Sequence, residues 1–208
     1  MLPIQFKAMR KGERSKRKIL LEAFKLFATQ PYEAVSFKVL ENEIGISRGS
    51  MIYYFKNKEG LFKEILSTFF FSSSSVKSVP EPYKLSLYSF FSYFIEILKK
   101  GKETMSEMGI ENLNEALMRI ENSALTHIEN FKEIAHTWFD EENKIWLSVL
   151  ERSIKSGEIS NKIDPQVYAE IFEACYLGKS YIGVFTKNGY KIEQLLTYYD
   201  SIYKLIRN

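Results

Sequence analysis

The sequence predicts an all-α fold, and three observations lead to that prediction. Only 10 Gly and 5 Pro interrupt 208 residues, which favours long helices over a β protein with many turns. A hydrophobic fraction of 45% and a charged fraction of 26% are typical of a globular chain and exclude general disorder, collagen and a coiled-coil rod. Apolar residues also recur at helical spacing along most of the chain. We therefore expect about nine helices, arranged as a three-helix N-terminal head and a larger C-terminal helical bundle.

The first helix is predicted from an apolar stripe that follows Ser15 and stops at Pro31. Proline lacks the backbone N–H that a helix interior needs, so the helix ends before it. The stripe consists of Leu20, Ala23, Phe24, Phe27 and Ala28. This spacing predicts a helix with one face buried.

Two short helices joined by a tight turn are expected next. Ser36 and Ser47 are of the residue type that caps helix N-termini, and Gly45 stands where a left-handed residue ends a helix. Met51 and Phe55 fall one turn apart in the second of these helices, so we expect both in the core of the head.

The rest of the chain is also expected to be helical. A fourth helix, Lys58 to about Phe71, joins head to body, and Ser72 to Ser75 with Pro80 and Pro82 form a linker. Later helices are expected at 83–100, 103–121, 124–156, 165–187 and 191–206, with an interruption near 140–143. We divide the chain into residues 1–57, an N-terminal arm and DNA-binding head with its motif at about 36–55, and residues 58–208, an effector-binding and dimerisation body.

Charge is divided unevenly between head and body. Residues 1–60 contain 12 Lys and Arg against 6 Asp and Glu, a net charge of +6, whereas residues 61–208 contain 17 against 20, a net charge of −3. A basic head on a mildly acidic body indicates that only the head meets a polyanion such as nucleic acid. A solubilising basic terminus is the alternative, because Lys7, Arg10 and Lys11 supply part of the excess.

The helices expected at 36–44 and 47–55, with a Gly turn between them, have the form of a helix-turn-helix. The second helix of such a motif lies in the major groove, where its amide dipole and the Ser47 hydroxyl meet a phosphate and Arg48 supplies charge. Gly49 permits a close approach of the helix backbone to DNA. A helical hairpin within an ordinary core is the alternative interpretation.

The segment Ile46-Ser47-Arg48-Gly49-Ser50-Met51-Ile52-Tyr53-Tyr54-Phe55-Lys56-Asn57-Lys58-Glu59-Gly60-Leu61 resembles the signature of TetR-type (tetracycline-repressor-like) transcriptional regulators. Upstream, Ala23-x-x-x-Phe27, Tyr32 and Val35-Ser36 have the spacing of that family's first helix and of the entry to its second. The resemblance covers roughly Ser15 to Leu66. Beyond it the chain is similar to the family only in pattern, with Gly157-Glu158-Ile159 before Asp164-Pro165 and two closing helices.

The resemblance implies a set of DNA contacts in the head. It implies phosphate contacts for Ser36 and Ser47 at helix starts, a place at the groove for Arg48, Gly49, Ser50 and Tyr53, a backbone or base contact for Tyr54, and a phosphate contact for Lys58. Surface packing within the head is the alternative for both tyrosines.

Four residues of the head depart from the family pattern. Pro31 stands where Gly is usual before the aromatic residue, and Glu41 and Ile44 stand where small residues are usual, which bears on the packing of the second helix. Ile52 replaces the Tyr that commonly touches the DNA backbone, so one hydroxyl donor to the phosphates is lost.

Aromatic residues are unusually frequent, with 16 Phe, 13 Tyr and 2 Trp making up 15% of the chain. Rings in the body are candidates to line a pocket for an unidentified small apolar or aromatic effector. The candidates are Phe90, Tyr93, Phe94, Phe131, Trp138 and Tyr176. For any one ring, a place in the plain core is the alternative, and the resemblance implies a pocket without identifying its ligand.

A homodimer is expected, because paired heads on a two-fold pseudo-palindrome supply contacts that one head lacks. The resemblance implies that the last two helices form a four-helix bundle across the axis, with Leu195 and Tyr199 in the interface. Ala174, Gly178 and Ile182 recur every four residues, and close packing would explain a helical Gly that costs about 1 kcal/mol relative to Ala. Packing of this seam within the monomer is the alternative.

Other functional classes find little support. Cys175 is the single cysteine, which excludes an internal disulfide and a Cys-based zinc site and fits a reducing compartment. His127 and His136 are nine residues apart without a Cys or a clear carboxylate pair, and no nucleophile elbow or P-loop is present, so we expect no metal, cofactor or enzymatic activity. Without a secretory signal or a long apolar run, we expect a cytoplasmic protein with no membrane partner.

The sequence thus predicts a one-component transcriptional regulator. By resemblance it is a repressor that binds a double-stranded, pseudo-palindromic DNA operator as a homodimer and is released by a small-molecule effector. The alternative is an all-α protein-interaction module with a degenerate DNA-binding head. The charge distribution and residues 47–50 favour the regulator, and Ile52 is the one feature that favours the alternative.

Overall fold

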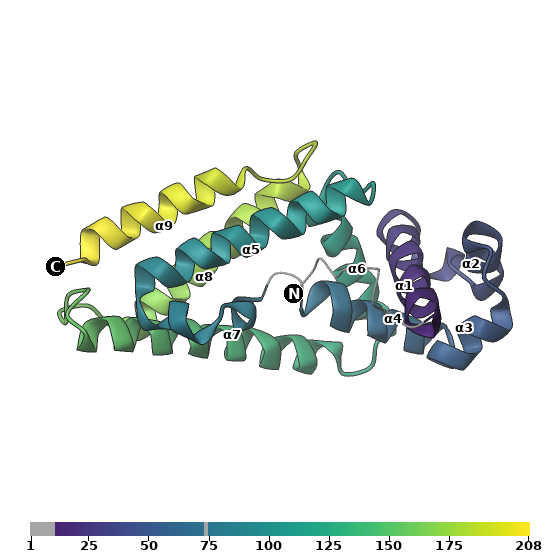
Figure 1. Cartoon of the computed structure of the whole chain (residues 1–208), viewed down its shortest axis with the longest axis horizontal. Helices are drawn as coiled ribbons and strands as arrows, with labels where there is room; N and C mark the ends of the chain where they lie inside the picture. Colours follow the sequence, from purple (N-terminus) through teal and green to yellow (C-terminus); the bar gives the residue numbers. More distant parts are fainter. Residues whose placement is uncertain (1–10, 73–74) are drawn as a thin grey trace. The chain divides into compact units, whose positions relative to one another are not determined.

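A computed structural model describes residues 11–72 and 75–208 (Figure 1). Residues 1–10 of the predicted N-terminal arm, with Lys7 and Arg10, and residues 73–74 of the predicted linker lie outside the described residues. The all-α prediction is confirmed, because nine α-helices and no strand form within the described residues. The helices are α1 (Lys11–Thr29), α2 (Phe37–Ile44), α3 (Arg48–Phe55), α4 (Lys58–Ile65), α5 (Leu87–Glu107), α6 (Leu113–His127), α7 (Phe131–Lys155), α8 (Pro165–Val184) and α9 (Ile192–Ile206).

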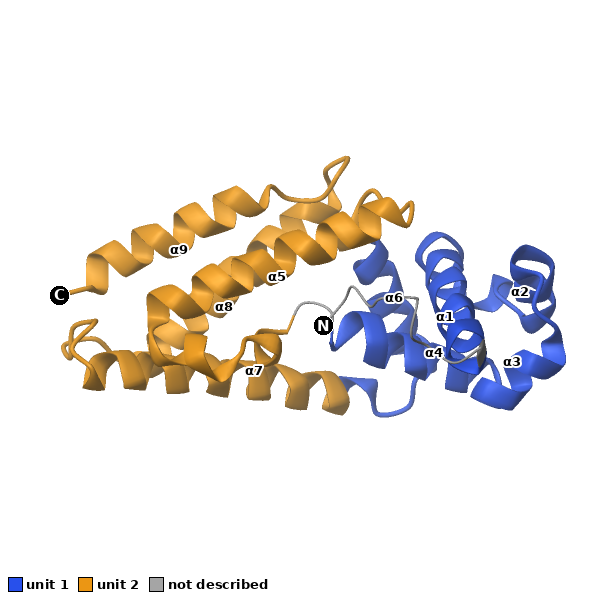
Figure 2. Cartoon of the chain, in the orientation of Figure 1, with its two compact units in different colours: residues 1–73, 115–132 blue, residues 74–114, 133–208 orange. Residues whose placement is uncertain are grey.

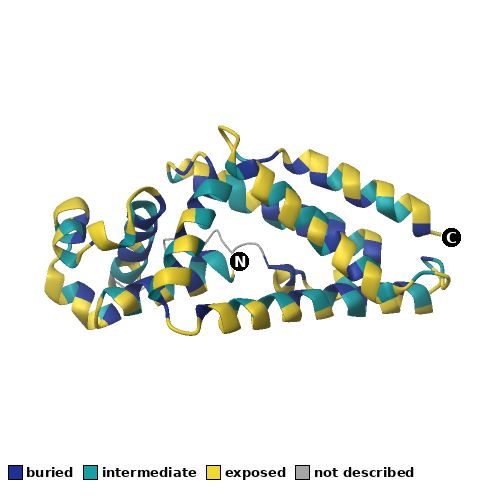
Figure 3. Cartoon of the chain, turned by 180° about the vertical axis from the view of Figure 1, so that it is seen from behind, coloured by how far each residue is buried: buried dark blue, intermediate teal, exposed yellow. Residues whose placement is uncertain are grey.

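The chain divides into two compact units, which Figure 2 shows in different colours. Unit 1 comprises residues 1–73 and 115–132, and unit 2 comprises residues 74–114 and 133–208. Most of α6 therefore groups with the N-terminal helices. In each unit the buried residues lie on the inner sides of the helices (Figure 3).

The first helices of unit 1 form where their sequence signals predict. The apolar stripe of α1 is buried, and the helix ends at Thr29, just before Pro31. Ser36 accepts a hydrogen bond from the Val39 N–H at 3.2 Å and so caps α2. Gly45 ends α2 with φ of 69°, a left-handed conformation that a Cβ would disfavour. The first helix begins at Lys11, earlier than predicted.

The fourth helix begins where predicted but changes its hydrogen-bonding pattern. Asn57 caps α4 by accepting a hydrogen bond from the Gly60 N–H at 2.7 Å. A Cβ on Gly60 would lie 2.2 Å from the Phe55 carbonyl oxygen, so this first turn needs glycine. After Ile65 a π-helical turn, η2 (Leu66–Phe70), continues the helix.

Unit 2 is built around stacked aromatic side chains. Trp146 stacks on Phe172 with 5.1 Å between ring centroids, and Phe90 meets Trp146 edge-on at 4.7 Å. The Tyr199 hydroxyl donates to the Phe172 carbonyl at 3.1 Å inside this core. Short 3-10 helices η3 (Val76–Ser78) and η4 (Glu81–Leu85) lead into α5, and Ile159 and Arg207 form an isolated antiparallel bridge. Part of the high aromatic content therefore fills this core.

Three predicted boundaries in the middle of the chain are wrong. The helix expected to end at residue 100 continues through Gly101 to Glu107, and Gly109 leaves it with φ of 85°. The next break falls at 128–130, where Asn130 has φ of 57°. The interruption expected near 140–143 does not form, because α7 is continuous across it. No described helix is long and apolar enough to cross a membrane.

Candidate functional site

The exposed surface of α3 is the first candidate site. Arg48 and Gly49 are exposed, Tyr53 has an exposed fraction of 81%, and Met51 and Phe55 are buried beneath them. The two faces follow from the sequence, because the buried residues are four apart and the polar ones lie between them. Helix α3 thus presents its N-terminal residues and Tyr53 to solvent while its apolar side anchors it in unit 1.

The N-terminus of α3 is capped mostly from within unit 1. Ser47 accepts a hydrogen bond from the Ser50 N–H at 3.3 Å, and the two hydroxyls lie 3.0 Å apart. Glu41 of α2 accepts a hydrogen bond from the Arg48 N–H at 3.0 Å. No hydrogen bond to the Gly49 N–H is seen within the described residues, and no atom lies within 4 Å of where its Cβ would be. Gly49 therefore offers an open amide at a helix N-terminus.

The tyrosines predicted at the DNA surface differ in environment. Tyr53 projects into solvent and meets Tyr54 edge-on at 5.1 Å between centroids. Tyr54 is half-buried, and its hydroxyl lies beside Gly12 in α1. Ile52, with an exposed fraction of 45%, places an aliphatic side chain on the same exposed surface. Tyr53 is available for a contact as it stands, whereas Tyr54 also packs within unit 1.

Lys58 is held inside unit 1. Its ammonium donates to the Tyr32 carbonyl at 2.8 Å and lies 4.0 Å from the centre of the Tyr32 ring. Partial burial lowers the pKa of Lys58, and Glu33 opposes that shift. The Tyr32 ring also stacks on His127 at 4.3 Å, and His127 lies 2.8 Å from Glu33. A phosphate contact by the Lys58 side chain would require it to leave these partners.

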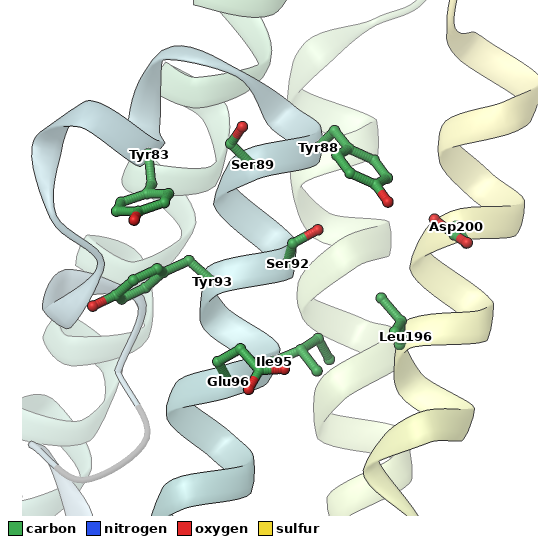
Figure 4. A pocket seen from close by; sticks show the side chains of 9 residues that line it. All are labelled: Tyr83, Tyr88, Ser89, Ser92, Tyr93, Ile95, Glu96, Leu196 and Asp200. Carbon is green, nitrogen blue, oxygen red and sulfur yellow. The ribbon is translucent and has the colours of Figure 1, made fainter.

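An open groove between α5 and α9 is one hollow of unit 2. Figure 4 shows Tyr83 and Tyr93 on one side of it and Tyr88, Leu196 and Asp200 on the other. Its volume is about 410 Å³, within the range of small-molecule pockets. The two carboxylates at its walls, Glu96 and Asp200, are 3.0 Å from Lys99 and 4.0 Å from Lys204.

A second, nearly closed cavity lies among α5, α7, α8 and η3. Its lining residues are Val76, Phe94, Trp138, Phe139, Glu142, Trp146, Glu173, Tyr176 and Leu177. With a volume of about 10 Å³, it has room for about one water molecule. Three predicted pocket residues, Phe94, Trp138 and Tyr176, meet here.

The other predicted pocket residues lie elsewhere. Tyr93 lines the open groove of Figure 4. Phe90 is fully buried against Trp146, and Phe131 packs on Phe70 and Phe71 in unit 1. Phe90 and Phe131 fill apolar cores and line neither of these two hollows, so their place in an effector pocket stays a prediction.

Two carboxylates of the closed cavity were missed at the sequence level. Glu142 has an exposed fraction of 5% and accepts hydrogen bonds from the Ser75 hydroxyl and, at 2.8 Å, from the Val76 N–H. Glu173 accepts a hydrogen bond from the Asn143 amide at 2.9 Å. Burial raises the pKa of both carboxyl groups. The available signal was their inward register: Glu142 lies four residues before buried Trp146, and Glu173 lies four residues after buried Ala169.

Helix α8 presents an apolar strip to solvent. Ala174, Gly178 and Ile182 are all exposed, and no atom lies within 4 Å of where a Gly178 Cβ would be. Tyr181 and Phe185 extend the strip with exposed fractions of 58% and 74%. The alternative in which this seam packs within the monomer is therefore wrong.

Two predicted interface residues of α9 need correction. Leu195 and Tyr199 have exposed fractions of 0% and belong to the core of unit 2. Their side chains are buried by packing on α5 and α8, so they present no surface to a second chain.

Neither histidine stands in a metal-binding group. His136 is exposed and lies 3.1 Å from Asp140 one turn away. Within residues 11–72 and 75–208, no three His, Cys, Asp or Glu side chains come together as metal ligands. Cys175 is half-buried, and burial raises the pKa of its thiol.

The fold and the α3 surface define a helix-turn-helix protein with an all-α C-terminal part. Residues 19–65 match the sequence model of the bacterial regulatory proteins of the tetR family. The matched residues include α2 and α3, so the likeness to that family lies in the N-terminal helix-turn-helix segment. A comparison with curated protein sequences finds no match.

Solved structures share this fold along nearly the whole chain. The SmeT–triclosan complex is 15% identical, with a TM-score of 0.68, and the match covers 94% of this chain and 92% of that one. A transcriptional regulator from Saccharomonospora viridis in complex with choline is 14% identical, with a TM-score of 0.65 and coverages of 94% and 99%. NalD, the secondary repressor of the MexAB-OprM multidrug efflux pump in Pseudomonas aeruginosa, is 17% identical, with a TM-score of 0.57 and coverages of 95% and 99%.

Proposed function

We propose that this chain is a cytoplasmic one-component transcriptional repressor. It binds a pseudo-palindromic DNA operator as a homodimer and is released by a small-molecule effector. The observation that carries the proposal is the exposed N-terminal part of α3, where Arg48, Gly49 and Tyr53 face solvent within the segment that matches the tetR family. Arg48 supplies charge there, and the Gly49 amide is placed to meet a phosphate.

The remaining parts of the proposal have support of their own. The exposed apolar strip of α8 fits a self-complementary contact about a two-fold axis. The open groove of unit 2 has the volume of a small-molecule pocket, and two of the solved structures hold a small molecule. NalD, a structure of the same fold, is named as a repressor.

Five further contacts with DNA belong to the proposal, and the structure supports them unequally. They are the contacts of Ser36, Ser47, Ser50, Tyr54 and Lys58. Ser36 and Ser47 are exposed at helix starts, where a hydroxyl and a phosphate can share the same amides. Tyr54 would make its contact with DNA from a half-buried position. For Lys58, the backbone at the start of α4 is the better phosphate ligand, since its ammonium already has partners in unit 1.

The experiment is selection of bound duplexes from a random DNA pool with the full chain, followed by gel shift. We expect one enriched pseudo-palindrome. Arg48→Ala should relax the preference at one base pair, by about 1–3 kcal/mol if the side chain reaches a base edge. Recovery of no enriched sequence would favour the alternative, an all-α protein-interaction module whose head no longer reads DNA, for which Ile52 at the α3 surface is the supporting feature.

A further inference from the structure

The closed cavity of unit 2 combines two features that together indicate the charge of its ligand. Its wall contains five aromatic rings, from Phe94, Trp138, Phe139, Trp146 and Tyr176. Glu142 and Glu173 are the two charged residues of its wall, and no Lys, Arg or His residue lines it. Aromatic faces and carboxylates both attract cations, whereas neither favours an anion.

The charge on Glu142 is not balanced by an ion pair in the described residues. Its hydrogen-bond donors are the neutral Ser75 hydroxyl and the Val76 N–H. The nearest cationic side chain that influences it, Lys77, is paired with Glu141 on the outer side of α7. A buried carboxylate without a counter-ion is costly, and a bound cation would remove that cost.

We propose that this cavity is a binding site for a small organic ammonium cation, held by the aromatic rings and the carboxylates of Glu142 and Glu173. The inference rests on the proposed function, because it specifies the charge class of the effector. The sequence predicts only a small apolar or aromatic effector, and this proposal assigns the effector a positive charge.

The cavity is nearly closed as described, so the ligand must move part of its wall. Trp138 and Phe139 are only half-buried, whereas Phe94 and Trp146 are 1% and 2% exposed. The first two rings are therefore the part that can swing outward, and a cation selects the opened state to which it binds better. A cation larger than the space that opens when Trp138 and Phe139 move outward should not bind.

Lowering the pH should weaken cation binding at this cavity. The groups around Glu142 and Glu173 set the pKa values through which this loss occurs. Glu173 and burial favour the neutral form of Glu142, while Lys77, Ser75 and Val76 favour its ionised form. For Glu173, burial is the main cause that raises the pKa, Glu170 and Asp140 add to it, and the hydrogen bond from Asn143 lowers it. Because a cation binds the ionised carboxylates, its affinity should fall as the pH is lowered through their raised pKa values.

The test uses tetramethylammonium and its uncharged counterpart of similar shape, 2,2-dimethylpropanol. Trp138 and Trp146 are the only tryptophans in the chain, and both line the cavity, so intrinsic fluorescence of the full protein reports on this site. We expect a saturable fluorescence change with tetramethylammonium, at ionic strength matched with sodium chloride, and a much weaker response to the alcohol.

Glu142→Gln and Glu173→Gln should each weaken tetramethylammonium binding at least about tenfold, since each removes a charge next to the ligand. Glu141→Gln is the matched control, because this neighbour is exposed and does not line the cavity, and it should bind as the natural chain does. Circular dichroism verifies that each variant is folded. Glu173→Gln keeps the test decisive if Glu142→Gln fails to fold.

Equal binding of the ammonium ion and the alcohol, unchanged affinity in both cavity variants, or no saturable response to the ammonium ion would each overturn the proposal. DNA binding is measured separately by gel shift. A chain that shifts DNA but does not bind the cation refutes this inference alone. A chain that binds the cation but enriches no DNA sequence refutes the proposed function alone.

Discussion

At the scale of single residues, Glu41 shows how a departure from the family pattern acquires a structural role. Its carboxylate accepts the Arg48 N–H at 3.0 Å, at the end of α3 that the proposed function assigns to DNA contact. A negative charge stabilises a helix N-terminus, but it also repels a phosphate approaching the same end. Glu41 thus stabilises α3 and opposes phosphate binding at once.

We therefore expect Glu41→Gln to strengthen DNA binding. The amide oxygen keeps the hydrogen bond from Arg48, while the repulsion is lost, which by the usual size of helix-terminus effects raises affinity about two- to fivefold at low salt. Titrated gel shifts with the selected duplex measure it. Glu43→Gln, at an exposed position of the same helix, is the control. Equal or weaker binding by Glu41→Gln would contradict this role.

Glu142 leads to a prediction about stability and pH. Burial raises its folded pKa above the unfolded value, so between the two values the folded chain holds more protons and stability falls as the pH rises. Glu142→Gln removes this loss of stability at higher pH, because glutamine has no ionisable side chain. Its amide oxygen can accept from Val76 and its NH₂ can donate to Ser75, so both hydrogen bonds survive.

The variant should accordingly be more stable than the natural chain at pH 7 and equal to it near pH 4, below both pKa values. Denaturation by urea, followed by tryptophan fluorescence, measures the difference in unit 2. A variant that is less stable at pH 7 would show that the charged form of Glu142 stabilises the fold.

At the scale of elements, Lys58 ties the start of α4 to η1 (Tyr32–Ala34) through the Tyr32 carbonyl and ring. Lys58→Met keeps the aliphatic stem and removes the ammonium, which should destabilise unit 1 by about 1–2 kcal/mol through the lost charged hydrogen bond. Lys56→Met, exposed and two residues earlier, is the control and should cost much less. Thermal unfolding by circular dichroism tests this. If Lys58→Met leaves stability unchanged but weakens binding to all DNA sequences, the side chain serves as a phosphate ligand instead.

The helix boundaries show which features of the fold local sequence signals can predict. Caps and breakers predicted α2, α3 and the start of α8 well, because Ser36, Ser47 and Asp164 each accept a hydrogen bond from the first turn. The helix predicted to end at residue 100 continues through Gly101 to Glu107. Met105 in this added part of α5 is buried, and only tertiary packing supplies that burial.

At the scale of the whole molecule, the proposed dimer makes the exposed strip of α8 the interface. Ala174→Glu combined with Gly178→Arg should place charges in a desolvated contact and yield folded monomers that no longer shift operator DNA. Both positions are exposed in the single chain, and a Cβ at residue 178 would meet no atom within 4 Å, so the substitutions should leave the fold intact.

Sedimentation measures the outcome, with circular dichroism to verify helix content. Substitutions of matched charge at the exposed positions Glu151 and Lys155 of α7, Glu151→Arg and Lys155→Glu, provide the control and should leave the dimer unchanged. A soluble, helical double variant of α8 that remains dimeric would place the interface elsewhere.

The sequence by itself determined the all-α class, the helix-turn-helix and the inward face of each N-terminal helix. These follow from local causes, namely helical periodicity, caps and breakers, which act within a few residues of each other. Only the tertiary structure decided that Tyr199 and Leu195 are core, that Phe131 and Trp138 belong to different units, and that Glu142 and Glu173 line one cavity. Residues distant in sequence meet there through packing, and a helical pattern states only that a residue faces inward, not which partner it will find.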